Sequence, residues 1–235
     1  GEYYVMPFRG EAYFTYYNKK VFEKAGVPTP ETYVEKGEWT WDKFIEVAKQ
    51  LATGDGEVYG ALFYTWGSQQ VFPADQRGLE YITADGEVDI DDSLAYSFAM
   101  RKTLEDAKAM IPLAELKATK THYTQAFWAG NLGMLVIGGW FPGQMRHGSK
   151  DGSLQGFTWN DWSLTRMPCN EDEYVTVGAP TGNVIHIDSE KKEAAFKFLS
   201  WMAGAEGSIV VAQNGLMPAL FTPEVQEVFA SVLPD

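Results

Sequence analysis

The sequence predicts a helix-rich protein of the α/β or α+β class, and three observations support this prediction. Short apolar runs that are typical of buried strands, such as residues 132–137, alternate with longer segments of helical apolar spacing. The chain has 235 residues, enough to bury a sizeable core. Its composition, 45% hydrophobic and 22% charged, is that of an ordinary globular protein without low-complexity tracts. Disorder is therefore not expected.

The expected elements of the first half alternate between strands and helices. They are a strand at Tyr3–Phe8, helices at Lys19–Ala25 and Trp41–Thr53, a strand at Val58–Phe63 and a helix at Trp66–Arg77. Gly26 marks a helix end, because glycine readily takes the left-handed conformation there. Thr40 is a suitable N-cap for the helix that follows it. Asp85-Gly86, placed between two short runs that can pair, predicts a hairpin.

The second half predicts a similar alternation. Its expected elements are helices at Asp92–Met110 and Tyr123–Ala129, a strand at Leu132–Ile137, a helix from about Trp140, a strand at Val184–Ile187, a helix after Ser189, and two further helices after Ala205 and Thr222. The helix after Ser189 is expected to turn Phe198 and other apolar residues inward. The polar stretch from Gly148 to about Tyr174 is expected to be rich in loops.

The charge balance argues against several partners. With 32 acidic and 19 basic residues the formal net charge is -13, which repels nucleic-acid phosphates and anionic membrane surfaces. We therefore expect no nucleic-acid partner. The apolar runs are far shorter than the roughly 20 residues that cross a bilayer, so no transmembrane segment is expected in this chain. The single cysteine, Cys169, lies among carboxylates, which disfavour a thiolate nucleophile.

Several reaction classes lack the motifs that they require. The chain has neither a GxxxxGKS/T phosphate loop nor a GxGxxG turn, and no GxSxG nucleophile elbow. Its histidines, His122, His147 and His186, lack the spacing of zinc ligands, and residues 85–91 depart from a calcium loop. No metal or cofactor is therefore expected. Paired carboxylates for glycoside hydrolysis stay open, with Asp161 between two tryptophans as the acid to test.

The segment FWAGNLGMLVIGGW is the strongest candidate for a binding function. Aromatic residues make up 14% of the chain and include 8 Trp, which suits a protein that stacks flat apolar ligand faces. In this segment Gly138-Gly139 directly precedes Trp140, after a buried strand. Two glycines let a backbone approach a ligand closely. The tryptophan by itself is equally well explained as a core residue.

Four blocks of the sequence together indicate a family. They are MPFRGEAYFTYYNKKVFEKAGVPTPETY, TWDKFIEVAKQLA, FWAGNLGMLVIGGW and TGNVIHIDSEKKEAAFKFLSWMAGAEGSIVVAQNGLMPA. In this order they resemble the extracellular solute-binding proteins of bacterial ABC transporters, the family that contains maltose- and oligosaccharide-binding proteins. Lys43 replaces a usual Glu in the second block, and Asn131-Leu132-Gly133 departs from the pattern in the third. Because the four blocks extend over nearly the whole chain, the likeness is stronger than any single motif.

This resemblance implies an α/β, helix-rich fold of the periplasmic binding protein type II, with mostly the second of two lobes present. It implies a hinge strand at residues 1–12, the second lobe at 13–177 and a return toward the first lobe at 178–235. We expect the chain to be a truncated fragment without the export signal and lipid anchor of an extracytoplasmic protein, either periplasmic or lipid-anchored at a Gram-positive surface.

The resemblance also implies a function. We expect a sugar or oligosaccharide to bind in a cleft between lobes and to be delivered to ABC permease subunits. Trp140 and Trp66 are expected to stack on the ligand, Gln69, Arg9 and Asn183 to hydrogen-bond it, and Gly182 to allow close backbone approach. The alternative is a glycoside hydrolase in which the same aromatic residues line a catalytic cleft.

Overall fold

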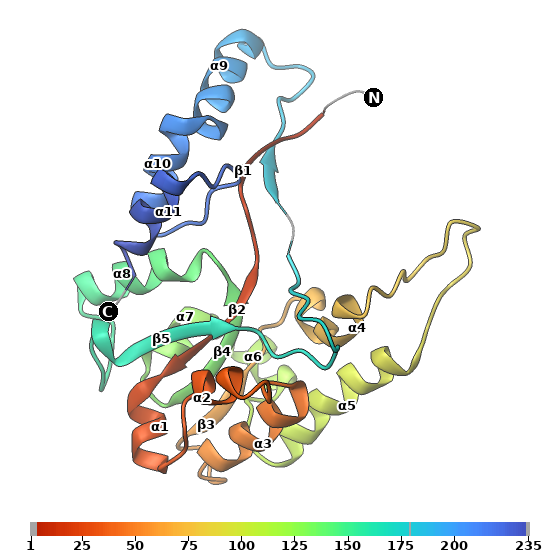
Figure 1. The fold of residues 1–235 in the computed structure, drawn as a ribbon, viewed down its shortest axis with the longest axis vertical. Coiled ribbons are helices and arrows are strands. Elements are labelled where there is room, and N and C mark those ends of the chain that lie inside the picture. The colour runs from red at the N-terminus through yellow and green to blue at the C-terminus, as the bar shows by residue number, and fades with distance from the viewer. Residues whose placement is uncertain (1–3, 179, 234–235) are drawn as a thin grey trace. The chain divides into compact units, whose positions relative to one another are not determined.

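A four-stranded and a two-stranded sheet organise the structure, a computed structural model that describes residues 4–178 and 180–233 (Figure 1). The four-stranded sheet belongs to a unit formed by Tyr13–Ile137 and Gly152–Val177, which we call the large unit. Gly1–Ala12, Gly138–Asp151 and Gly178–Asp235 form a second, small unit. Residues 138–151, which the sequence analysis placed within 13–177, thus group with the two chain ends. That these units are the lobes of a larger protein stays a prediction.

The sheet of the large unit has the strand order β3-β4-β2-β5. Its strands are β2 (Tyr13–Asn18), β3 (Tyr59–Leu62), β4 (Leu132–Gly138) and β5 (Trp162–Arg166). β3 and β4 run parallel, and β2 and β5 run antiparallel. All seven residues of β4 are buried, so this strand needs cover on both faces.

Helices pack against this sheet and beside it (Figure 1). They are α1 (Lys19–Ala25), α2 (Pro30–Glu35), α3 (Trp41–Leu51), α4 (Phe72–Gln76), α5 (Asp92–Asp106), α6 (Leu113–Thr119) and α7 (Tyr123–Trp128), with short 3-10 turns η1 (Gly67–Gln70) and η2 (Trp159–Asp161). Gly26 ends α1 with a φ of 67°, and the Thr40 hydroxyl accepts a hydrogen bond from the Lys43 N–H at 3.2 Å, as the sequence predicts for these two ends.

Aromatic rings fill much of the core of the large unit. Trp41 stacks on Phe72 with centroids 6.2 Å apart, and Phe44 stacks on Phe63 at 5.6 Å. All four rings are fully buried. The indole N–H of Trp41 donates to Gln76 Oε1 at 2.6 Å, so the ring is buried without an unpaired polar group. A large share of the aromatic excess in the sequence is therefore structural.

Two glycines let α3 and the parallel strand pair pack closely. A Cβ at Gly60 of β3 would lie 1.8 Å from the Ala48 carbonyl oxygen of α3, and one at Gly133 of β4 would lie 2.8 Å from the Gly60 carbonyl oxygen. No larger residue fits at Gly60 unless the backbone moves. The departure at Gly133 from the family pattern therefore has a packing reason in this chain.

In its described residues, the small unit combines the two-stranded sheet with four helices. β1 (Met6–Arg9) pairs antiparallel with β6 (Thr181–Asn183), and the helices are α8 (Phe141–Asp151), α9 (Lys192–Ala203), α10 (Ala205–Gln213) and α11 (Pro223–Ala230). The segment at 217–219 lies along β1, since Gly10 N–H donates to Met217 O and Ala219 N–H to Phe8 O.

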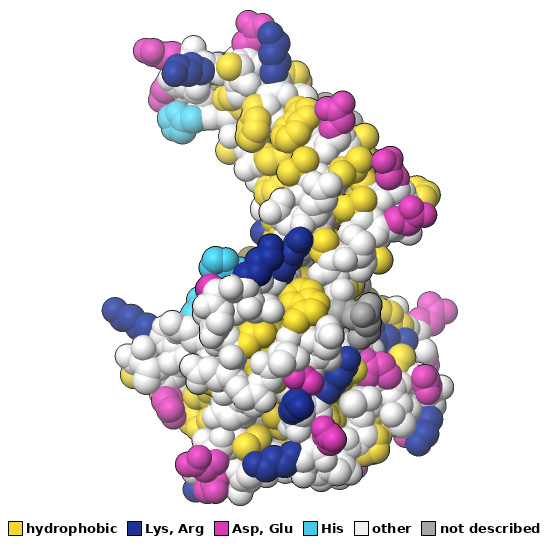
Figure 2. All heavy atoms as spheres, turned by 90° about the vertical axis from the view of Figure 1, so that its left-hand side faces the viewer, with side chains coloured by type: hydrophobic (Ala, Val, Ile, Leu, Met, Phe, Trp, Pro, Cys, Tyr) yellow, Lys and Arg dark blue, Asp and Glu magenta, His cyan; other side chains and the backbone are white. Residues whose placement is uncertain are grey.

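The helix α9 is apolar but contains no buried residue. Phe198 is 57% exposed and Trp201 43%, and Figure 2 shows hydrophobic side chains on the surface of this part of the chain. The expectation that Phe198 turns inward is therefore wrong within the described residues. The strand expected at Val184–Ile187 is also wrong: β6 ends at Asn183, because β1 offers pairing partners only as far as that residue.

Three stretches of the large unit differ from what their sequence patterns predict: two expected helices are shorter, and one expected loop contains a strand. The helix expected at Trp66–Arg77 is divided into η1 and α4, because Val71 has a non-helical φ of -131° and ψ of 18°. α5 ends at Asp106 rather than Met110, since Lys108 takes a left-handed φ of 52°. In the stretch expected to be loops, β5 forms by pairing with β2.

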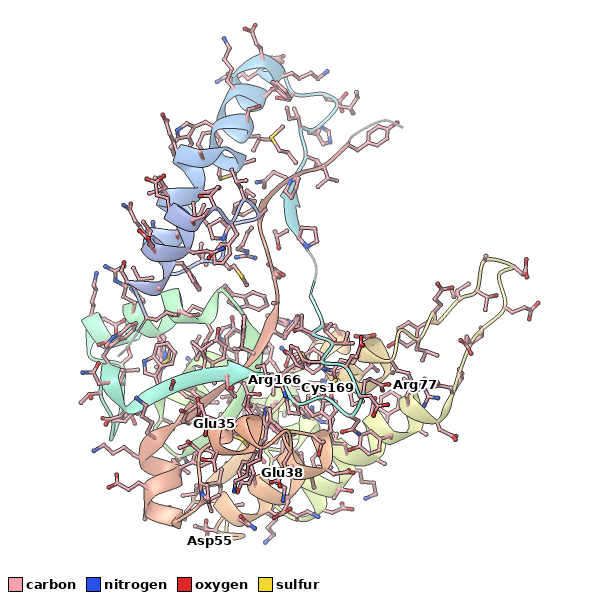
Figure 3. The ribbon with its side chains drawn as sticks, in the orientation of Figure 1. Glu35, Glu38, Asp55, Arg77, Arg166 and Cys169 are labelled. Carbon is pink, nitrogen blue, oxygen red and sulfur yellow. The ribbon has the colours of Figure 1, made fainter. Side chains whose placement is uncertain are left out.

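The Asp85-Gly86 hairpin forms as a turn with little strand pairing. Gly86 has a φ of 83°, but the strand pairing of the flanking runs is a bridge between Ile82 and Val88, beside a hydrogen bond from the Glu87 N–H to Thr83 Oγ1 at 3.2 Å. At the base of this projecting arm, Arg77 Nε lies 3.5 Å from Asp91 Oδ2 (Figure 3). The first expected strand, Tyr3–Phe8, begins at a residue outside the described range, and β1 extends to Arg9.

Candidate functional site

An aromatic cluster lies where β3 leads into η1 in the large unit. It consists of Tyr64 and Trp66 from the loop after β3 and of His122 and Tyr123 from the start of α7. Tyr64 lies 5.2 Å from Trp66 and 5.1 Å from Tyr123, centroid to centroid, and the Trp66 and Tyr123 rings are 5.7 Å apart. Tyr123 is nearly buried, whereas Trp66 is 39% exposed. The cluster thus holds one indole firmly while leaving part of it accessible.

The position of the cluster is favourable for binding. Tyr64 and Trp66 follow the carboxyl end of a strand that runs parallel to its neighbour β4. Ligands of α/β proteins bind preferentially outside the carboxyl ends of such strands. An accessible indole offers a flat apolar surface with a negative π-face, which attracts the C–H groups of a ligand.

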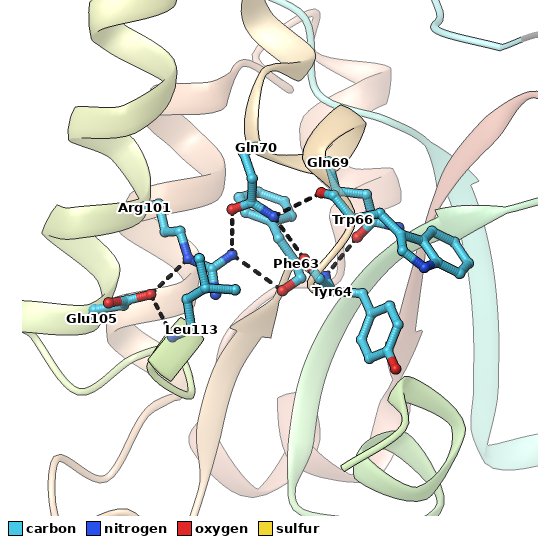
Figure 4. Close-up of polar contacts among 8 residues, drawn as sticks. All are labelled: Phe63, Tyr64, Trp66, Gln69, Gln70, Arg101, Glu105 and Leu113. Atoms are coloured by element: carbon cyan, nitrogen blue, oxygen red, sulfur yellow. Dashed lines mark hydrogen bonds and ion pairs between the residues drawn. The ribbon is translucent and has the colours of Figure 1, made fainter. Parts of the chain in front are cut away.

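Gln69 lies beside the cluster but is fully buried. Its Oε1 accepts a hydrogen bond from the Tyr64 N–H at 2.6 Å, so it supports the loop that carries Tyr64 and Trp66 (Figure 4). Its Nε2 is buried without a hydrogen-bond partner among the described residues. The direct ligand contact expected of Gln69 stays a prediction.

In the small unit, Arg9 and Trp140 lie together. The guanidinium carbon of Arg9 is 5.5 Å from the centroid of the Trp140 ring, within the range of a cation–π contact. The ring is 9% exposed. A Cβ at Gly138 would lie 2.0 Å from Trp140 Cζ3, so the first glycine of the pair is needed for the indole itself. Stacking of Trp140 on a ligand stays a prediction.

Arg9 is also held by polar contacts. One guanidinium nitrogen, Nη2, forms an ion pair with Glu11 and donates to Thr181 Oγ1 at 3.3 Å. Its Nε is buried and has no partner among the described residues. These contacts orient the side chain beside Trp140.

Gly182 and Asn183 lie on β6 in the same unit. They pair with Pro7 and Met6 of β1. A Cβ at Gly182 would lie 2.1 Å from Cγ1 of Val5. The close approach that this glycine permits is therefore made by the protein's own strand, and a contact of either residue with a ligand stays a prediction.

The expected residues thus fall into two sets. Arg9, Trp140, Gly182 and Asn183 belong to the small unit, and Trp66 and Gln69 to the large unit. Sequence analysis did not include Tyr64, His122 or Tyr123 in the site. The spacing of Tyr64 and Trp66 directly after a buried strand was the available signal, whereas His122 and Tyr123 are more than 50 residues away and meet them only in the folded unit.

Asp161, the acid named for the hydrolase alternative, caps η2. Its Oδ2 accepts hydrogen bonds from the Thr158 hydroxyl at 2.8 Å and from the Thr158 N–H at 2.7 Å. These bonds, with a smaller contribution from Lys20, hold the pKa of Asp161 below its usual value. A general acid for glycoside hydrolysis needs the opposite shift.

Other chemistry finds little support in the described part of the chain. Cys169 is buried in the loop after β5, near Arg166, where its thiol points to the Glu173 carbonyl at 3.9 Å (Figure 3). Residues 4–178 and 180–233 contain no group of three or more His, Cys, Asp and Glu side chains placed to hold a metal ion. No helix in these ranges combines the length and apolar character that a bilayer crossing requires.

His122 should make the stability of the large unit depend on pH. Its Nδ1 accepts a hydrogen bond from the Thr124 N–H at 3.4 Å, and burial lowers the pKa of the imidazole below its usual value of about 6.5. The neutral form is therefore favoured in the folded state. This contribution to stability is present above about pH 6.5 and is lost as the pH falls through the lowered pKa.

The measurement is the free energy of unfolding of the chain and of His122→Asn between about pH 7 and pH 5. Asparagine caps a helix without titrating. We expect the natural chain to lose more stability than the variant over this interval. If the free energy of unfolding changed equally with pH in both proteins, His122 would not be the source of the pH dependence.

Comparisons with known proteins agree with one another. Residues 1–209 match the family model described as bacterial extracellular solute-binding protein. A lactose-binding protein of Rhizobium radiobacter is 23% identical over 232 residues, which are 92% of this chain and 52% of that protein. The chain spans about half the length of the curated relatives that it matches.

Solved structures show the same fold. A sugar transporter protein from Rhizobium etli, in an open conformation, is 34% identical with a TM-score of 0.78, covering 99% of this chain and 57% of that one. An ABC substrate-binding protein from Listeria monocytogenes, in complex with cycloalternan, is 24% identical with a TM-score of 0.76, covering 97% and 55%. These likenesses confirm the predicted α/β, periplasmic binding protein-like fold.

Proposed function

This chain belongs to the family of bacterial extracellular solute-binding proteins, and we propose that it is part of the sugar-binding component of an ABC importer. The observation that carries the proposal is the aromatic cluster, whose accessible Trp66 is held at the carboxyl end of a parallel strand. The names of the similar proteins, which refer to lactose and to cycloalternan, point to saccharides. The protein acts outside the cytoplasm, in the periplasm or anchored at the cell surface, and passes its ligand to permease subunits.

The aromatic cluster around Trp66 and the pair of Arg9 and Trp140 both suit a sugar ligand. A pyranose ring has apolar C–H faces that stack on an indole, and a rim of hydroxyl groups that need hydrogen-bond partners. In the small unit, Arg9 Nε is an oriented donor without a partner among the described residues, close to Trp140. We therefore propose Trp66 in one unit and Arg9, Trp140 and Asn183 in the other as ligand contacts, and the two tryptophans are tested separately below.

Delivery to a permease requires that the ligand change the protein. A ligand shifts a two-state protein only if it binds one state more tightly than the other. Family resemblance suggests a hinged closure as that change. Residues that touch the ligand in only one of the two states then control transport as well as affinity.

Trp66→Ala should weaken saccharide binding by about 1–3 kcal/mol, or roughly 5- to 150-fold in Kd, because a stacking surface is lost. The complete natural polypeptide is titrated calorimetrically with lactose, maltotriose, arabinotriose, β-1,6-galactobiose and ribitol. Phe98→Ala is the matched control, since Phe98 is an exposed aromatic residue of α5 in the same unit. An unchanged Kd for Trp66→Ala would remove Trp66 from the site.

Trp140→Leu should also raise the Kd by roughly 5- to 150-fold, because leucine keeps an apolar side chain but removes the aromatic face. The ring is nearly enclosed, so some loss of stability is expected too. Trp39→Leu is the control for this loss of stability, since Trp39 is a buried tryptophan of the large unit that is not among the proposed ligand contacts. Equal affinities of the two variants would show that Trp140 has only a structural role.

The protein should bind saccharides without converting them. Incubation of the complete polypeptide with the same panel, followed by chromatography of the sugars, is expected to return each compound unchanged. The low pKa of Asp161 is one reason for this expectation. Product that forms in proportion to protein concentration and disappears in Asp161→Asn would favour the hydrolase alternative.

A further inference from the structure

Arg101 is a buried charge in the middle of α5. It is 6% exposed, and burial lowers the pKa of its guanidinium, opposed by the neighbouring Glu105. Removing a charge from water is costly unless hydrogen bonds replace the lost hydration. Its contacts therefore show what the charge does in this protein.

Most of those contacts lead to the loop that carries the aromatic cluster. Arg101 Nη1 donates to the Phe63 carbonyl at 3.2 Å and to Gln70 Oε1 at 2.7 Å (Figure 4). Gln70 Nε2 in turn donates to the Tyr64 carbonyl at 2.7 Å and to the Trp66 carbonyl at 3.0 Å. Three of the four carbonyls at residues 63–66 thus accept hydrogen bonds from Arg101 or Gln70.

The other end of the network fixes Arg101 itself. Its Nε donates to Glu105 Oε1 at 2.6 Å, one helical turn along α5. The same oxygen accepts from the Leu113 N–H at 3.0 Å, at the start of α6. The guanidinium is therefore held between a carboxylate on one side and the loop on the other.

The loop needs these side chains because its own backbone lacks regular pairing. β3 ends at Leu62 and η1 begins at Gly67, so residues 63–66 lie outside both elements. Buried carbonyls without partners cost free energy, and a fixed donor favours one conformation of such a segment. Tyr64 and Trp66 project from this conformation.

We propose that Arg101, acting through Gln70, is a positioning residue that holds Tyr64 and Trp66 in the ligand-binding arrangement before the ligand arrives. The inference rests on the proposed function, since it assigns the network a role in affinity. Preorganisation raises affinity because the apparent Kd equals the intrinsic Kd divided by the fraction of molecules in the competent conformation. Arg101 itself touches no ligand.

The test is Arg101→Met in the complete natural polypeptide, titrated with whichever of lactose, maltotriose, arabinotriose, β-1,6-galactobiose or ribitol the natural protein binds most tightly. If the loop is competent in about a tenth of the variant molecules, the Kd rises about tenfold. Amide hydrogen exchange of residues 63–70 without ligand should become faster. Lys102→Met is the matched control, because Lys102 makes an exposed ion pair with Asp106 on the same helix.

A second control separates positioning from general loss of stability. Val47→Ala removes buried methyl groups in α3 without touching the network, and should lower the unfolding temperature without changing the Kd or the loop exchange. An unchanged Kd in Arg101→Met, or a rise no larger than that in Val47→Ala, would overturn the proposal. If Arg101→Met does not fold, Arg101→Lys keeps the charge but cannot donate in both directions, and the same two readouts apply.

Gln70 provides an independent check. Because Arg101 acts through Gln70, the losses of binding free energy in Arg101→Met and Gln70→Met should not be additive. The Kd of the double variant should be close to the higher of the two single-variant Kd values. Fully additive losses would contradict the relay. Failure of the function itself looks different: the natural protein would then bind none of the five compounds, whatever the loop exchange of Arg101→Met shows.

Discussion

Complete burial of β4 is the constraint on which the large unit depends. A strand with all seven residues buried must be paired along both edges and covered on both faces. β3 and β2 supply the pairing, and the cover includes α3, which comes close enough only because Gly60 and Gly133 carry no side chain. Aromatic stacking around Trp41 and Phe44 then fills the space beside this contact.

The same constraint determines where functional side chains can lie. Side chains inside the sheet are buried in packing contacts, so side chains that can contact a ligand lie mainly where the chain leaves the sheet. After β3 the chain has four residues without regular pairing before η1, and these carry Tyr64 and Trp66. Three of their four carbonyls accept hydrogen bonds from the side chains of Arg101 and Gln70. These bonds fix a segment whose backbone lacks the regular pairing of a sheet.

Aromatic residues serve two purposes in this chain. Trp39, Trp41 and Trp162 are buried in the large unit, and Trp140 is almost enclosed beside Arg9 in the small unit. Trp66 alone of these five is substantially exposed, although its ring is held by two tyrosines. The proposal of sugar binding therefore depends on how the rings are divided between core and surface rather than on their number.

The sequence by itself determined the family, the α/β class and the ends of the best-defined helices, because these depend on local signals. Gly26 and Thr40 are capping residues whose preferences act within one helical turn. Local signals also marked Trp66 and Trp140 as candidates, since each follows an apolar strand run. The close approach at Gly182 could not be foreseen, because its neighbour Val5 lies near the other end of the chain.

Only the tertiary structure decided where the strands β5 and β6 lie and which side chains meet. β5 forms in a polar stretch because β2 offers it hydrogen-bond partners, and β6 stops at Asn183 because β1 offers none beyond it. The aromatic cluster joins residues 64 and 66 to residues 122 and 123, and Arg101 reaches the loop from a third element. Contacts between residues so far apart leave no periodic trace in the sequence, since the chain must first fold to bring them within bonding distance.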